Sequence, residues 1–331
     1  MGQATGFAPG PFTARQAADL GLTRGRLREL VKNGQVRRVM RGVYVDAPVP
    51  DTTELRTRSL SLVIPDGVVV GLRTAAWLWG VDVTALGAHL VVPPVDLMGP
   101  AGSAATRRTG VSGHTGPLGD SDVALRDNVW ITTPARTAAD LGRCLRRPDA
   151  LASLDAMLRL PTLTAEVVTQ ELAKFAGYRG VVQARELVGL ADPRSESPME
   201  SRTRLRAIDA GFPAFEPQVE VFDDIGSFVA RLDLGRPAER KAVEYDGDAA
   251  HSSAEQQAHD RRRRRDVERC GWGLAVVTAD LVLGHSLAFE HGVAELLGCG
   301  FRLSKHHPRY GGWDRPGWAA PVTRGATTTS A

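Results

Sequence analysis

Two acidic side chains lie at facing positions of a predicted β-hairpin, where they could bind a metal ion. The hairpin covers residues 229–247, with Asp233 between two leucines of the first strand and Glu244 after Ala-Val in the second. Side chains at facing positions of an antiparallel pair come within reach of each other, so the two carboxylates can meet, with Asp246 just beyond. Crowded carboxylates repel each other unless a divalent cation lies between them. The spacing therefore predicts an Mg²⁺ or Mn²⁺ site in a metal-dependent nuclease centre.

Two further residues are candidates for the same chemistry. Phosphodiester hydrolysis requires neutralisation of the pentavalent state and an activated water, which a bound cation can provide. His251 lies a few residues after Asp246 and could act as general acid or base at neutral pH, although a solvated loop histidine is an equally common alternative. Glu200 is the third residue of a helix predicted to follow the N-cap Ser197 and to end at Gly211, a position that also suits a capping box.

The secondary structure predicted around these residues has the order helix, three strands, helix, strand. After the helix come strands over 218–222, 228–234 and 241–245, an Arg-rich helix over 254–270 and a strand over 273–278. This α-β-β-β-α-β order is that of the PD-(D/E)XK restriction-endonuclease core. We therefore predict a restriction-endonuclease-like domain over residues 193–303.

Several short motifs occur here in the order of a known family. They are Glu196-Ser-Pro-Met-Glu-Ser201, Arg231-Leu-Asp233, Val243-Glu-Tyr-Asp-Gly247 with His251, and Gly271-Trp272. Over about residues 195–285 the chain resembles the nuclease-like domains related to the very-short-patch mismatch-repair endonuclease. The resemblance implies that Asp233 and Glu244 hold Mg²⁺ with help from Glu200.

The chain departs from this family in two places. Asp246 occupies the position where the familiar pattern has a lysine, so it could ligate the metal or orient His251. The cysteines cannot supply the structural zinc site of the mismatch-repair enzymes, so mismatch specificity is not implied. Asp233 and Glu244 also have a simpler alternative, which is pairing with a nearby Arg or Lys on the surface of a sheet.

Five consecutive arginines occupy positions 261–265 of the Arg-rich helix. They cannot all share one face, because successive helical residues rotate by about 100°. Some of them, with Arg262 and Arg265 as candidates, are predicted to bind phosphate, and others to pair with Asp260, Asp266 or Glu268. A solvated charged face is an equally common alternative.

The first fifty residues have the pattern of a helix-turn-helix followed by a hairpin. Helices are predicted over 14–20 and 24–32, with N-caps at Thr13 and Thr23, and a basic hairpin over 35–45. This plan is that of a winged helix-turn-helix, whose second helix enters the major groove of DNA. The residues predicted to contact DNA are Arg24, Arg28, Lys32, Arg37, Arg38 and Arg41.

Motifs in this segment carry a second resemblance. Leu20-Gly-Leu-Thr23, the Leu-Arg-Glu-Leu-Val-Lys-Asn-Gly run that ends at Gly34, and Arg41-Gly-Val-Tyr44 look like the N-terminal domain of AbiEi-type antitoxins. The resemblance covers about residues 10–50. It implies winged-helix DNA binding, often for repression of the protein's own operon, and a toxin or antitoxin partner. A small helical domain with a solvated basic face is the structural alternative.

Residues 51–192 are predicted to form an α/β scaffold without a site of their own. A helix with two buried tryptophans is expected over 71–79, and Arg136, Thr137 and Asp140 are expected to cap and to pair on the surface. The other predicted elements are helices over 52–62, 135–145, 150–160, 165–175 and 181–190 and strands over 89–92 and 128–132.

Composition and charge limit the remaining possibilities. The 331 residues suffice for two or three domains, and no apolar run suggests a membrane span or a signal peptide. Three widely spaced cysteines argue against disulfides and fit a reducing cytoplasm. Residues 1–50 hold eight Lys/Arg against three Asp/Glu, whereas residues 195–250 hold seven against twelve. Basic ends around an acidic middle suit phosphate contacts around a metal site.

We therefore predict a cytoplasmic α/β (α+β) multidomain protein that acts on DNA. Its parts are a winged helix over 1–50, an α/β middle domain over 51–192, the nuclease-like domain over 193–303, and a disordered tail over 304–331. The expected function is Mg²⁺-dependent cleavage of DNA, in defence or toxin–antitoxin biology. The alternatives are a non-enzymatic antitoxin-like repressor with a degenerate nuclease fold, and an RNA-directed nuclease.

Overall fold

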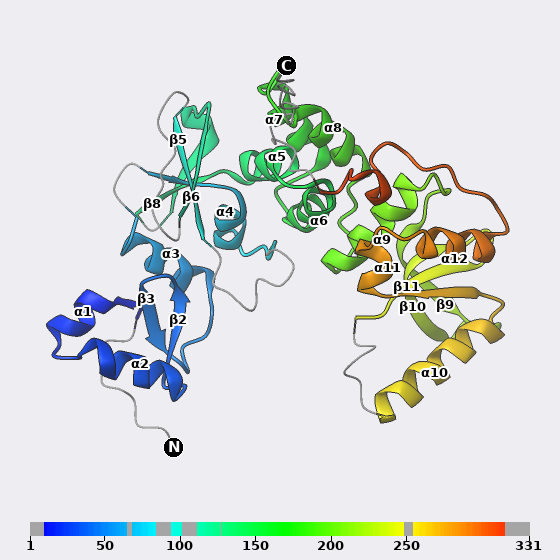
Figure 1. Cartoon of the computed structure of the whole chain (residues 1–331), viewed down its shortest axis with the longest axis horizontal. Helices are drawn as coiled ribbons and strands as arrows, with labels where there is room; N and C mark the ends of the chain where they lie inside the picture. Colours follow the sequence, from blue (N-terminus) through cyan, green and yellow to red (C-terminus); the bar gives the residue numbers. More distant parts are fainter. Residues whose placement is uncertain are drawn as a thin grey trace, which may run out of the picture. The chain divides into compact units, whose positions relative to one another are not determined.

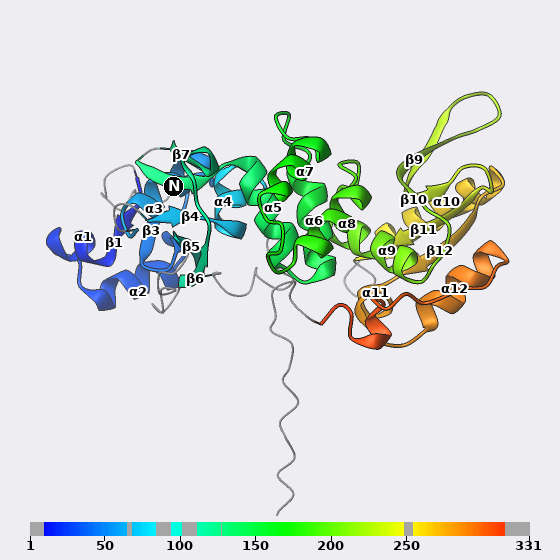
Figure 2. The same cartoon turned by 90° about the horizontal axis from the view of Figure 1, so that it is seen from above.

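The chain forms two compact units in a computed structural model (Figures 1 and 2). The structure describes residues 10–64, 68–83, 94–100, 111–126, 128–247 and 254–314. The first unit contains Met1–Leu141 and Leu160–Glu171, and the second contains Gly142–Arg159 and Leu172–Ala331. The mixed α/β architecture is confirmed. The domain boundaries at residues 50 and 192 are not where these units divide, and they stay a prediction.

The first unit begins with two capped helices and a small antiparallel sheet. Thr13 and Thr23 cap the helices as predicted, through hydrogen bonds from the backbone N–H of Gln16 and Arg26. Leu27, Leu30 and their neighbours pack between the helices and the sheet. The elements are β1 (Phe12–Thr13), α1 (Ala14–Asp19), α2 (Arg24–Lys32), β2 (Val36–Met40) and β3 (Val43–Asp46), with strand order β1-β3-β2.

The rest of the first unit is built on a five-stranded mixed sheet of order β6-β5-β4-β8-β7. Its buried core includes Leu60, Leu78 and Ile131. Trp77 and Trp79 are half-buried rather than buried. The guanidinium of Arg56 covers the ring of Trp77, and the indole N–H of Trp79 donates to the carbonyl oxygen of Thr132. The elements are α3 (Thr53–Ser61), β4 (Val69–Val70), α4 (Leu72–Leu78), β5 (Val95–Pro100), β6 (Val111–Gly116), β7 (Val123–Arg126) and β8 (Val129–Thr132). The strand predicted over 89–92 lies outside the described residues.

Four more helices follow, together with the helix that begins after Ser197. They are α5 (Pro134–Cys144), α6 (Arg147–Met157), α7 (Ala165–Ala173), α8 (Val181–Leu190) and α9 (Pro198–Asp209). Helix α6 begins three residues earlier than predicted, because Pro148 lies in its first turn. Proline is tolerated there, since an N–H at that position has no hydrogen-bond partner within the helix. Arg136 and Asp140 pair inside the protein and not on its surface, since both side chains are buried and lie 2.7 Å apart.

A four-stranded sheet of order β12-β11-β10-β9 forms the C-terminal part of the second unit. Helix α10 covers one face of this sheet and α12 covers the other (Figures 1 and 2). Strand β11 runs parallel to β12 and antiparallel to β10. The elements are β9 (Glu216–Phe222), β10 (Phe228–Arg236), β11 (Lys241–Tyr245), α10 (Ala254–Arg269), β12 (Gly273–Val277), α11 (Ala279–Leu283) and α12 (Ala288–Leu297). The predicted order of helix, three strands, helix and strand is found.

The prediction that disorder begins at residue 304 is wrong for residues 304–314. His307 is fully buried and its Nε2 lies 2.8 Å from a carboxylate oxygen of Glu290. Trp313 is also buried and donates its indole N–H to Asp209. Residues 315–331 lie outside the described part. In the described ranges, no helix has the length and apolar character needed to cross a membrane.

Candidate functional site

Strands β10 and β11 bring Asp233 and Glu244 together. The strands pair Leu234 with Val243, so Asp233 and Glu244 occupy the next facing positions. The side chain of Asp233 turns back to its partner strand, where Oδ2 accepts a hydrogen bond from the backbone N–H of Tyr245 at 2.8 Å. The two carboxylates inferred from the hairpin pattern are therefore neighbours.

The surroundings of Asp233 favour its neutral form. Burial raises the pKa of Asp233 from 3.8 to about 6, and the negative charges of Glu200 and Glu244 act in the same direction. The hydrogen bond from Tyr245 and the charge of Arg263 oppose this shift without cancelling it. Two neighbouring carboxylates thus act on Asp233, as expected of a site that is either functional or strained.

Arginines of helix α10 pair with the other two predicted metal ligands. Glu244 is only 3 % exposed, and its Oε2 accepts a hydrogen bond from Arg263 Nη2 at 2.9 Å. Its Oε1 is buried without a hydrogen-bond partner among the described residues. Asp246 Oδ2 accepts from Arg264 Nη2 at 3.0 Å. The prediction that these arginines pair with Asp260, Asp266 or Glu268 is wrong, because their partners lie on β11 and just after it.

Glu200 is tied to the backbone and to strand β9. Its N–H donates to the Ser197 side chain as expected of an N-cap, but its carboxylate accepts from the backbone N–H of Glu196 at 2.9 Å. The same oxygen accepts from the amide of Gln218 at 2.8 Å. Gln218 has a left-handed backbone with φ of 57°, which is costly for a residue with a side chain. The hydrogen bond to Glu200 is one contact that offsets this cost.

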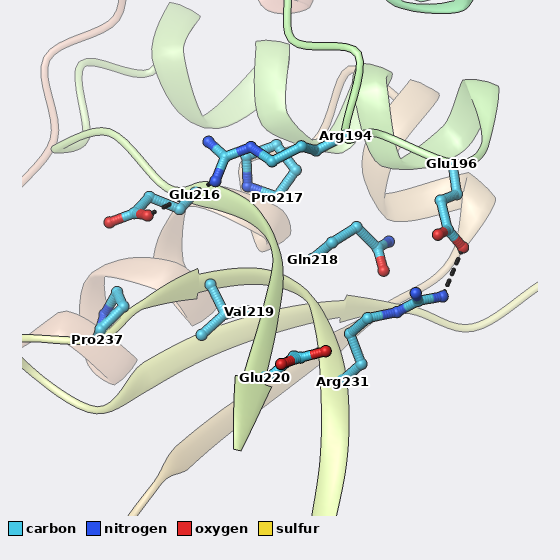
Figure 3. A pocket seen from close by; sticks show the side chains of 9 residues that line it. All are labelled: Arg194, Glu196, Glu216, Pro217, Gln218, Val219, Glu220, Arg231 and Pro237. Carbon is cyan, nitrogen blue, oxygen red and sulfur yellow. Dashed lines mark hydrogen bonds and ion pairs between the residues drawn. The ribbon is translucent and has the colours of Figure 1, made fainter. Parts of the chain in front are cut away.

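An open depression of about 480 Å³ lies beside this group (Figure 3). Across its floor Arg231 pairs with Glu196 at 2.7 Å, and the side chain of Gln218 points into it. The residues that line the depression are Arg194, Glu196, Glu216, Pro217, Gln218, Val219, Glu220, Arg231 and Pro237. Asp233 and Glu244 are not among them, so the depression and the carboxylates are adjacent but separate features.

The predicted metal ligands do not fit a divalent cation in this arrangement. In the parts of the chain that the structure describes, no three His, Cys, Asp or Glu side chains are grouped so that they could hold a metal ion. Glu244 and Asp246 already have arginine counter-ions, and a cation would have to displace at least Arg263. The predicted acid–base residue His251 lies outside the described residues. The unpartnered Oε1 of Glu244 is the feature that would favour a cation.

The N-terminal basic residues are mostly exposed. Arg24, Arg28 and Lys32 follow one side of α2, all are exposed, and none has an ion-pair partner among the residues described. Arg38 and Arg41 are exposed on the hairpin, whereas the Arg37 side chain donates to the carbonyl oxygen of Val49. On α10, Arg262 and Arg265 are exposed. All but one of the residues predicted to contact DNA are therefore accessible to it.

The structure also contains buried ion pairs that the sequence patterns do not predict. Three of them join helices α6 and α9, between Arg147 and Asp209, Arg202 and Asp149, and Arg204 and Asp155. A fourth joins Arg206 to Glu290, both fully buried. The only sequence signal for them is that Arg202, Arg204 and Arg206 alternate along a helix, which is not specific. These pairs connect structural elements and have no access to solvent for chemistry.

Comparison with known proteins identifies two domains. A family described as "Transcriptional regulator, AbiEi antitoxin" matches residues 7–45, and one described as "AbiEi antitoxin C-terminal domain" matches residues 68–192. The uncharacterized proteins MT2308 and Rv2248 of two Mycobacterium tuberculosis strains are each 34% identical to the chain over 265 residues, which cover 78% of this chain and 91% of the relative.

Among solved structures, the RV2827C protein from Mycobacterium tuberculosis aligns with 65% of this chain and 84% of its own. The TM-score is 0.31 and the identity 14%, too low to support an argument. The two AbiEi domains and the 34% identical relatives carry the assignment. The chain belongs to a family of AbiEi antitoxin-domain proteins that includes these uncharacterized mycobacterial relatives.

Proposed function

We propose that the protein is a DNA-binding transcriptional regulator of the antitoxin type and that residues 10–46 form its winged helix. The observation that carries this proposal is the coincidence of two features. The match to the AbiEi transcriptional regulator covers residues 7–45, and the same residues present the unpaired cations Arg24, Arg28 and Lys32 on one side of α2. A toxin is the protein partner that the family implies.

The dimensions of α2 suit the major groove of DNA. An α-helix with its side chains is about 10 to 12 Å in diameter and the major groove is about 12 Å wide, so the nine residues of α2 can lie in it. Arg24, Arg28 and Lys32 recur every four residues, so their side chains follow one side of the helix and can reach base edges and phosphates. Arg38 and Arg41 on the β2–β3 hairpin are available for the flanking phosphates, as in the wing of this class of proteins.

The test is binding of the full chain to a duplex that contains the promoter of its own operon. Arg28→Ala removes one unpaired cation and is expected to weaken binding at least several-fold. Arg26→Ala is the matched control on the same helix, because Arg26 already pairs with Glu29 at 2.9 Å. Equal affinity of the Arg28→Ala and wild-type chains would contradict the proposal, provided that both remain folded.

For residues 193–303 we propose a nuclease-like fold that serves as a binding module and does not cleave. Support comes from the arginines that neutralise the predicted metal ligands, namely Arg263 at Glu244 and Arg264 at Asp246. An enzyme would keep these carboxylates available for a cation. The two ion pairs therefore favour a regulator over a hydrolase.

A second candidate function is Mg²⁺-dependent cleavage of DNA or RNA. The buried, unpartnered Oε1 of Glu244 and the raised pKa of Asp233 favour it, because a cation that displaced Arg263 would satisfy both groups. Plasmid nicking and RNA cleavage in the presence of Mg²⁺ or Mn²⁺ test this function. Cleavage by the wild-type chain that Asp233→Ala abolishes would establish an endonuclease, and no cleavage of either substrate would leave the regulator.

A further inference from the structure

One side of helix α10 carries three exposed arginines that have no ion-pair partner among the described residues. Arg261, Arg262 and Arg265 are exposed, and within the described residues none of them forms an ion pair. Exposed arginines on a helix commonly pair with acids three or four positions away. Of the acids near this run, Asp266 instead pairs with Arg269 at 2.7 Å.

The opposite side of α10 is fixed to the sheet. Val267 is buried in the core formed with β9, β10 and β11, and Arg263 and Arg264 bind Glu244 and Asp246. These contacts set the rotation of the helix about its axis. At 100° per residue, positions 261, 262 and 265 fall within an arc of about 100° that faces away from positions 263, 264 and 267. The three arginines are therefore presented to solvent together.

The chemistry of this surface favours a polyanion with regularly spaced charges. From Arg261 to Arg265 the helix rises about 6 Å, close to two charge spacings along one strand of DNA. The planar guanidinium group suits bidentate contacts with phosphate oxygens. A lipid surface is disfavoured, because no large apolar side chain is exposed among the described side chains of α10.

We infer that Arg261, Arg262 and Arg265 form a second DNA-binding surface, which contacts phosphates without reading the sequence. The choice of DNA as the polyanion rests on the proposed function, whereas the surface itself does not. Contacts to phosphates fix position and affinity but carry no base information. The chain then has two DNA-binding surfaces in two different units.

The salt dependence of DNA binding measures the contribution of these three arginines. Each neutralised phosphate contributes about 0.9 to the slope of log affinity against log salt concentration. The triple variant Arg261→Gln, Arg262→Gln, Arg265→Gln is therefore expected to lower this slope by up to about 2.7. The loss should be the same for a promoter duplex and for a shuffled duplex of equal length, measured by fluorescence anisotropy with the full chain.

Two further variants keep the outcomes distinct. Arg269→Gln on the same helix is the single-charge control, and it should lower the slope by much less than one third of the loss in the triple variant, because Arg269 is already paired. Replacement of Arg24, Arg28 and Lys32 by Gln should remove the preference for the promoter while leaving the contribution of α10. Loss of that preference tests the proposed function, and loss of slope in the α10 variant tests the second surface.

Several results would overturn the inference. A wild-type salt slope in a folded α10 triple variant would show that these arginines do not contact DNA. The same loss of slope per arginine in the triple variant and in Arg269→Gln would also exclude a specific surface, because general charge reduction would then explain the effect. Binding to phosphatidylserine vesicles that the triple variant loses, with DNA binding unchanged, would identify a membrane surface instead.

Discussion

Replacement of Asp233 by Asn is predicted to stabilise the protein at neutral pH. Burial and two neighbouring carboxylates raise the pKa of Asp233 to about 6, so the folded state binds this proton more tightly than the unfolded state. The stabilising contribution is then complete below the unfolded pKa of 3.8 and is lost as the pH rises through 6. Asn keeps an oxygen that can accept from the N–H of Tyr245 and has no charge to bury.

The size of the effect follows from the shift. Folding raises the pKa of Asp233 from 3.8 to about 6. The expected gain in the free energy of unfolding on replacement by Asn is therefore roughly 3 kcal/mol at pH 7 and well under 1 kcal/mol at pH 4. Urea unfolding of the wild-type and Asp233→Asn chains at the two pH values measures this difference in the free energy of unfolding. Tryptophan fluorescence is the readout, because Trp272 packs against the β9–β10–β11 core. Asp224→Asn, in an exposed turn, is the control that should show no such pH-dependent gain.

Unfolding of the same two chains with and without Mg²⁺ also distinguishes the two candidate functions. If Asp233→Asn destabilises the chain equally at pH 4 and pH 7, the reasoning about burial and carboxylate repulsion is wrong. Addition of Mg²⁺ provides a second comparison, because a ligand that binds the folded state raises its stability. Mg²⁺ should stabilise the wild-type chain more than the variant only if the carboxylates bind the metal. The regulator proposal predicts no difference.

Two further predictions concern positions in the second unit. Arg206→Met should lower the free energy of unfolding by about 3 to 5 kcal/mol, because it removes the guanidinium that pairs with the buried Glu290 carboxylate and leaves that carboxylate with His307 alone; thermal unfolding unchanged from wild type would refute this. Gly180→Ala should cost at least about 1 to 3 kcal/mol, since Gly180 has φ of 76° and its Cβ would lie 2.0 Å from the Arg143 carbonyl oxygen. The matched control is Gly189→Ala, whose Cβ would meet no atom within 4 Å, and equal stability of the two variants would contradict the strain assigned to Gly180.

Local signals allowed much of the fold to be predicted from the sequence. Strand β11 and helices α2 and α8 have the predicted bounds, because apolar periodicity and flanking turn residues act within a few positions. Thr13, Thr23 and Ser197 cap helices for the same local reason. The facing positions of Asp233 and Glu244 also followed from the hairpin alone, since an antiparallel register is set by its turn.

The charge state of the candidate site could not be predicted in the same way. The guanidinium groups of Arg263 and Arg264 bind acids about twenty residues away on another element, whereas sequence spacing suggested partners within the same helix. The buried pair between Arg147 and Asp209 spans 62 positions, and no local pattern encodes such a contact. The composition of residues 304–331 predicts disorder, because it does not reveal that His307 pairs with the buried Glu290.

Footprinting on the DNA upstream of the protein's own operon tests the central claim most directly. We predict a discrete protected segment with the wild-type chain and the loss of that segment when Arg24, Arg28 and Lys32 are replaced by Gln, since these cations lie on the exposed side of α2. Protection that persists in this triple variant, or a wild-type chain that protects no discrete segment, would contradict an antitoxin-type regulator that binds DNA through its N-terminal helices.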